Sequence, residues 1–128
     1  MSRVEDLVHN ISLRCDYFEA FWEAERKWHS NELGHISIHG VFSVLSEFVA
    51  SNFEQIPDNQ QQDLWEWIDW QHSSSEKDRT EAVVTCFLEN IADTEAERYC
   101  RPFLSENLAH WFDEHCHRGR RKKRWFEQ

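Results

Sequence analysis

Glycine and proline are scarce in this sequence, which has three glycines and two prolines among its 128 residues. Because these two residues mark many turns, their scarcity favours a few long helices over many short strands. It also excludes a glycine-rich phosphate-binding loop, since the three glycines lie far apart. We therefore expect an all-α fold that has no nucleotide-binding loop.

Long apolar runs and paired cysteines are missing as well. No stretch of eighteen apolar residues occurs, and the first ten residues lack the basic and apolar regions of a signal peptide. The four cysteines (Cys15, Cys86, Cys100 and Cys116) form no C-x-x-C pair, which is typical of free core thiols in a reducing compartment. We predict a cytoplasmic protein that does not enter a membrane.

Negative charge dominates all but the last residues of the chain. Residues 1–117 hold 23 acids and 8 lysines or arginines, a balance of −15, whereas residues 118–128 carry a balance of +5. We therefore divide the chain into an acidic helical domain, 1–117, and a basic carboxy-terminal tail, 118–128. The acidic domain should repel nucleic acid and attract basic proteins.

Apolar residues recur at helical spacing through most of the chain. The expected helices cover residues 3–29, 38–53, 58–72, 75–91 and 105–115. The fourth is apolar around about two-thirds of its circumference, which predicts a central position. Gly40 lies in the first turns of the second helix, where close contact with another helix would explain a glycine. The prediction is a single-domain irregular bundle of about five helices, arranged as stacked helical hairpins.

The stretch LWEWIDW, residues 64–70, combines three tryptophans with two acids. On a helix, Trp67 shares the apolar side with Leu64 and Ile68, whereas Trp65 points toward the acids and Trp70 lies at the boundary. We expect Trp67 in the core and Trp65 on the acidic surface, as a binding hot spot. The alternative is that Trp65 is covered by another helix or by the tail.

The predicted partner-binding residues combine this stretch with the acidic side of the first helix. Tryptophan buries a large area on binding, and nearby carboxylates attract a basic partner. The predicted set is Trp65, Glu66, Asp69, Trp70, Asp58, Asp16, Glu19 and Glu23.

No catalytic, cofactor-binding or metal-binding residues are predicted. The histidines of 110–117 have workable helical spacing with acids, yet no second pair of ligands stands at a defined distance. The acid pairs fit solvated helix surfaces, so that we predict a protein that is not an enzyme and needs no cofactor. The tail could bind RNA, with Trp125 and Phe126 stacking on bases, but the acidic domain would repel phosphate.

Residues 82–91, AVVTCFLENI, followed by Arg101-Pro102-Phe103-Leu104, resemble small all-helical immunity proteins of bacterial polymorphic toxin systems, of the contact-dependent inhibition and Rhs types. Residues 37–42 are similar to the start of their second helix, and the resemblance covers roughly 36–112. It implies a bacterial protein that binds and neutralises a cognate toxin domain. In this motif we expect Val83 and Phe87 in the core and an Asn90 hydrogen bond to a buried backbone group.

The sequence thus favours a monomeric acidic protein that occludes a basic toxin domain stoichiometrically. An acidic adaptor module that binds other proteins is the alternative. An RNA-associated factor that uses the tail is a third possibility. Neither the toxin nor its target follows from these residues.

Overall fold

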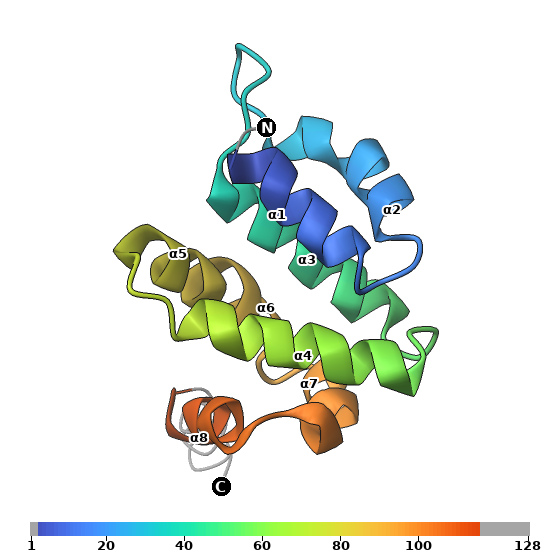
Figure 1. Ribbon diagram of the computed structural model, residues 1–128, viewed down its shortest axis with the longest axis vertical. Coiled ribbons are helices and arrows are strands. Elements are labelled where there is room, and N and C mark those ends of the chain that lie inside the picture. Colours follow the sequence, from blue (N-terminus) through green and yellow to red (C-terminus); the bar gives the residue numbers. More distant parts are fainter. Residues whose placement is uncertain (1–2, 116–128) are drawn as a thin grey trace, which may run out of the picture.

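The computed structural model describes residues 3–115, which form helices joined by short connections and contain no strand (Figure 1). The all-α prediction is therefore confirmed for this part of the chain. The α-helices are α1 (Arg3–Ser12), α2 (Phe18–Glu25), α3 (Ile38–Asn52), α4 (Asp58–His72), α5 (Lys77–Ala82), α6 (Glu89–Ile91), α7 (Glu95–Cys100) and α8 (Glu106–His115). Short 3-10 helices cover Arg26–His29 and Arg101–Phe103.

A π-helical segment, Val83–Leu88, joins α5 to α6 into one continuous helix. With this joined helix counted once and the two 3-10 helices left out, the described residues form seven helices, against the expected five. This continuous helix packs mainly against α3 and has Val83 and Phe87 fully buried, which confirms its central position. The Asn90 side chain donates to the Cys86 carbonyl (2.8 Å) and to the Ser46 hydroxyl (3.2 Å). The expected bond to a backbone group is therefore present, but Asn90 is exposed and the bond is not buried as expected.

The prediction of one long first helix is wrong, because the chain turns between α1 and α2. Tyr17, at the start of α2, has a left-handed backbone with φ 71°. The turn lets the apolar sides of two short helices, with Ile11 on α1 and Trp22 on α2, enter the same core. A continuous helix of 27 residues would extend about 40 Å and could not bring both sides onto one small domain.

Gly40 permits a close approach at the start of α3. A Cβ atom at this position would lie 2.7 Å from the Cγ1 atom of Ile36. The Ser37 hydroxyl caps the helix by accepting a hydrogen bond from the Gly40 N–H at 3.3 Å. A close contact is therefore present, but its nearest partner is the preceding loop and not another helix, as was expected.

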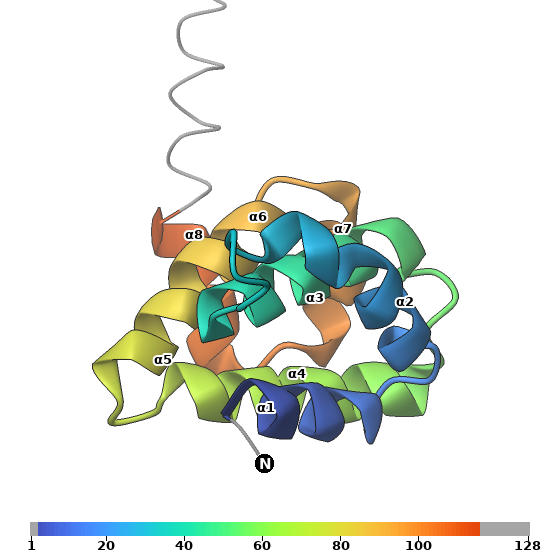
Figure 2. The ribbon, with the colours of Figure 1, turned by 90° about the horizontal axis from the view of Figure 1, so that it is seen from above.

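Helix α4 crosses the middle of the molecule (Figure 1), with α1 and α3 on one side and α7 and α8 on the other. Figure 2 shows that α1 and α4 form one side of the body, and that α6 lies on the opposite side. Helix α4 therefore has neighbours in two directions and still keeps an open outer side. That arrangement decides which of its side chains reach solvent.

Candidate partner-binding surface

Trp65 lies in the core, so the prediction that it is a surface hot spot is wrong. Its side chain is 1% exposed, and its ring packs 5.4 Å from the ring of Phe87. Trp67 is 5% exposed, as expected, and stacks on Phe42 of α3 at 6.0 Å. The alternative, in which another helix covers Trp65, is the one that the structure shows.

The buried arc of α4 is wide enough for both tryptophans. Each residue turns the helix by about 100°, so two residues turn it by about 200°, which equals about 160° in the opposite direction. Trp65 and Trp67 occupy the two edges of this arc, and Leu64 and Ile68 lie between them. Because α4 has neighbours on two sides, burying one tryptophan does not expose the other.

Gln61 satisfies the indole of Trp65 inside the core. Its Oε1 atom accepts a hydrogen bond from the Trp65 Nε1 atom at 3.1 Å, and its Nε2 atom donates to the Phe53 carbonyl at 2.9 Å. The Cys100 thiol also donates to Gln61 Oε1, at 3.5 Å. Gln61 is completely buried, so this network replaces the water that a tryptophan N–H would otherwise need. The i, i+4 spacing of Gln61 and Trp65 was the sequence signal for this contact.

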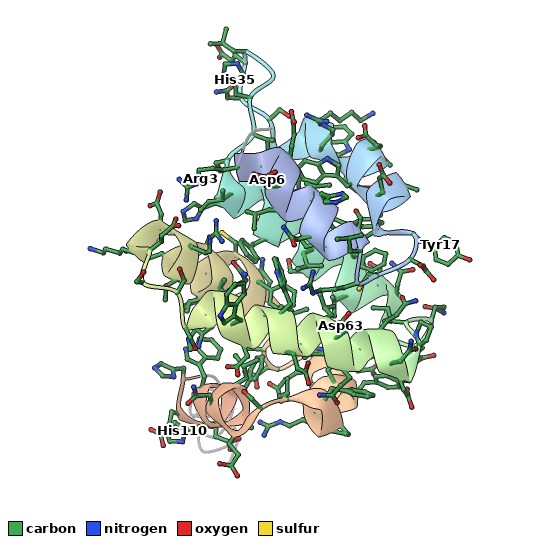
Figure 3. All side chains as sticks on the ribbon, viewed as in Figure 1. Arg3, Asp6, Tyr17, His35, Asp63 and His110 are labelled. Atoms are coloured by element: carbon green, nitrogen blue, oxygen red, sulfur yellow. The ribbon has the colours of Figure 1, made fainter. Side chains whose placement is uncertain are left out.

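The outer side of α4 carries the surface that was expected around Trp65. We call it the α4 acidic stripe, and it consists of Asp58, Asp63, Glu66, Asp69 and Trp70. Asp63 was not in the predicted set, although its spacing to Glu66 and Trp70 (i, i+3, i+7) places all three on one side of a helix. Figure 3 shows Asp63 on the side of α4 that faces the viewer.

Trp70 is the large apolar group of this stripe. Its side chain is 74% exposed, against 1% for Trp65. It also lines a hollow of about 360 Å³ together with Ser73 and Arg79 at the end of the helix. An exposed tryptophan among carboxylates is therefore present on α4, five residues beyond the predicted position.

The carboxylates of the stripe are only partly compensated within the described residues. Asp63 lies 3.8 Å from the Nε atom of Arg14, and Glu66 accepts a hydrogen bond from Gln62 at 3.1 Å. The Oδ1 atom of Asp69 is buried and has no hydrogen-bond partner among the described residues. The negative charge of Asp69 acts to raise the pKa of the half-buried His72, but desolvation by burial is stronger and leaves that pKa below 6.5.

The three acids predicted on the first helix do not join this stripe as one patch. Glu19 and Glu23 line a groove of about 220 Å³ between α1 and α2. Asp16 lies in the turn, where its carboxylate accepts a hydrogen bond from the Gln60 side chain of α4 at 2.9 Å. The break in the first helix separates Asp16 from the other two, and it places Asp16 beside the start of α4.

Cysteine and histidine chemistry offers little at this surface. Burial raises the pKa of Cys15 and of Cys100 to about 12, so both thiols stay protonated at neutral pH. Cys86, on the π segment, lies 3.5 Å from the Nδ1 atom of His39. Within residues 3–115, no three histidine, cysteine or acidic side chains gather in a way that could hold a metal ion. Cys116 and His117 lie outside the described residues.

No helix in residues 3–115 is long and apolar enough to span a bilayer. Comparisons with protein-family models, with curated proteins and with solved structures found no match to this chain.

Proposed function

We propose that this chain is a non-enzymatic immunity protein, which binds a cognate antibacterial toxin domain with the α4 acidic stripe. The observation that carries the proposal is Trp70, a largely exposed tryptophan among carboxylates. Such a residue can bury its ring in a partner's pocket, while Glu66 and Asp63 pair with basic groups around it.

The charge of the body supports the same kind of partner. Enzymes that act on nucleic acids or nucleotides need basic clefts, and a protein surface of opposite charge can cover such a cleft and exclude the substrate. Inhibition would then be stoichiometric and would require no catalytic group on the inhibitor. The resemblance of residues 82–91 and 101–104 to immunity proteins points to a toxin domain as that enzyme.

The groove between α1 and α2 favours a second candidate, an acidic adaptor. Glu19 and Glu23 line this groove together with Trp22, and a basic peptide segment could lie between the two helices. An adaptor would use this groove in place of the α4 acidic stripe. The third candidate, an RNA-associated factor, depends on the tail, which lies outside the described residues.

The deciding experiment is co-expression with the candidate toxin domain from the gene that neighbours this chain's own. We expect the wild-type chain to restore growth and to form a 1:1 complex, and Trp70→Ala to weaken both. A Glu19→Gln, Glu23→Gln variant is the matched control and should protect fully. If this control fails while Trp70→Ala protects, the adaptor-like groove is the binding site. If no variant, including wild type, binds or protects, the immunity proposal is wrong.

A further inference from the structure

We propose that the basic tail of this chain, residues 118–124, binds the side of the body formed by α6, the outer face of the continuous helix 77–91 and the end of α8. The site begins at a hollow of about 400 Å³ between α6 and α8. This proposal concerns the free protein and does not depend on the proposed toxin partner.

The hollow is lined by both apolar and acidic residues. Val84, Ala92 and Trp111 supply the apolar surface, while Glu89 and Asp93 supply carboxylates. Both acids are exposed residues. Arginine side chains suit such a place, because their methylene stems cover apolar groups while the guanidinium pairs with a carboxylate.

The last described residue of the chain lies at this hollow. His115, the last residue of α8, lines it and stacks on Trp111 with ring centroids 5.1 Å apart. Arg118 is only three residues further, so it can reach at most about 10 Å from His115. The site therefore lies within reach of the first tail arginine, and the covalent link gives it a high effective concentration there.

A further exposed carboxylate lies along the continuous helix, away from the hollow. Glu81 and Glu89 are both exposed on this helix, which is roughly 20 Å long. Nine extended residues, from His115 to Arg124, span at most about 30 Å. The six cations of residues 118–124 can therefore run from the hollow to Glu81.

The α4 acidic stripe is the competing site for the tail, and its position argues against it. Figure 2 shows α4 on one side of the body and α6, with the end of α8, toward the opposite side. The end of α4 is not remote from the start of the tail, because the charge of His115 acts on His72 there, but His115 lines the hollow beside α6 directly. Binding beside α6 instead leaves the α4 acidic stripe open to a partner.

Zero-length carbodiimide cross-linking tests the proposal, because it joins lysine amines only to carboxylates in direct contact. The chain has four lysines, and two of them, Lys122 and Lys123, lie in the tail. The Lys77–Glu81 pair, at 3.9 Å, is an internal control for the reaction. We expect the tail lysines of the full chain to be linked to Glu81 and Glu89, at a yield that is independent of protein concentration and falls in high salt.

Glu89→Gln should remove the cross-links to the hollow while the Lys77–Glu81 control link still forms, whereas Glu66→Gln, on α4, should leave the tail links unchanged. Three results would overturn the proposal. They are tail cross-links mainly to the α4 acidic stripe, links between differently isotope-labelled molecules in a mixture, and no tail links in wild-type protein in which the Lys77–Glu81 link forms.

Discussion

Trp65 and Trp70 lie five residues apart on α4, yet one is 1% exposed and the other 74%. The buried tryptophan has a ring neighbour, Phe87, and a hydrogen-bond acceptor, Gln61. The exposed tryptophan has carboxylates beside it on the outer side of the helix. The comparison teaches that tertiary neighbours decide the role of each ring, because both tryptophans stand close in sequence to the same acids.

The largest effect should come from truncating the buried tryptophan. Trp65→Ala removes a completely enclosed ring and leaves Gln61 without its indole partner, so we expect a loss of about 3–5 kcal/mol in the free energy of unfolding. Chemical denaturation measures this loss. Trp70→Ala is the matched control and should stay within about 0.5 kcal/mol of wild type. Equal losses in the two variants would show that the two sides of α4 do not differ as described.

Gln61 and Gln62 give a second comparison of the two sides, with adjacent residues of one type. Gln61→Met removes both ends of a buried network, including the bond to the Phe53 carbonyl, and should cost about 1–3 kcal/mol. Gln62→Met removes only an exposed contact to Glu66 and should be nearly neutral. Thermal melts of both variants check this prediction. A neutral Gln61→Met variant would mean that the network contributes nothing to stability.

Much of the inner side of α4 follows from the sequence. The predicted range 58–72 agrees with the observed helix, and the apolar periodicity correctly places Leu64, Trp67 and Ile68 in the core. Helical periodicity identifies one apolar side, but it does not tell how many neighbours a helix has. Trp65 was therefore assigned to the acidic side, and only the structure shows the second neighbour that buries it.

The break between α1 and α2 has a similar cause. Apolar residues at helical spacing continue through positions 11, 15, 18 and 22, and all four are buried, so that the pattern is the same for one long helix and for a hairpin. Leu13 and Tyr17 are both exposed in the turn. No glycine or proline marks this turn, although Tyr17 has a left-handed backbone of the kind that glycine adopts most readily.

On the outer side, the expected effect is on binding rather than on stability. If the proposed function is right, Trp70→Ala should weaken the toxin complex by about 2 kcal/mol, since the ring fills a pocket of the partner. Isothermal titration calorimetry gives this value. Trp28→Ala, at another largely exposed tryptophan on the 3-10 helix after α2, is the control and should bind as wild type. A Trp70→Ala variant of unchanged affinity would remove this residue from the interface.

A smaller effect should follow from reversing one charge of the stripe. Glu66→Lys should slow association about three- to tenfold at low salt, because the basic partner is no longer attracted to this side. The difference should shrink as salt is added. Glu32→Lys makes the same charge change on an exposed residue of the loop between α2 and α3, and it should slow association less. Stopped-flow kinetics at two salt concentrations separates the two variants.

The smallest expected effect is on the pH dependence of stability, and it concerns His72, a half-buried residue at the end of α4. Desolvation, with a contribution from the charge of His115, lowers the pKa of His72 below 6.5 in the folded protein, although Asp69 acts in the opposite direction. The unfolded chain therefore binds a proton at this position at a higher pH than the folded protein does. It follows that the contribution of His72 to stability is intact above pH 6.5 and is lost as the pH falls below that value.

We expect the melting temperature of wild type to decrease between pH 7 and pH 5, and the melting temperature of His72→Gln to decrease less. His110→Gln, at an exposed position on α8, should follow wild type. A His72→Gln variant that loses as much stability as wild type would show that other groups account for the acid sensitivity.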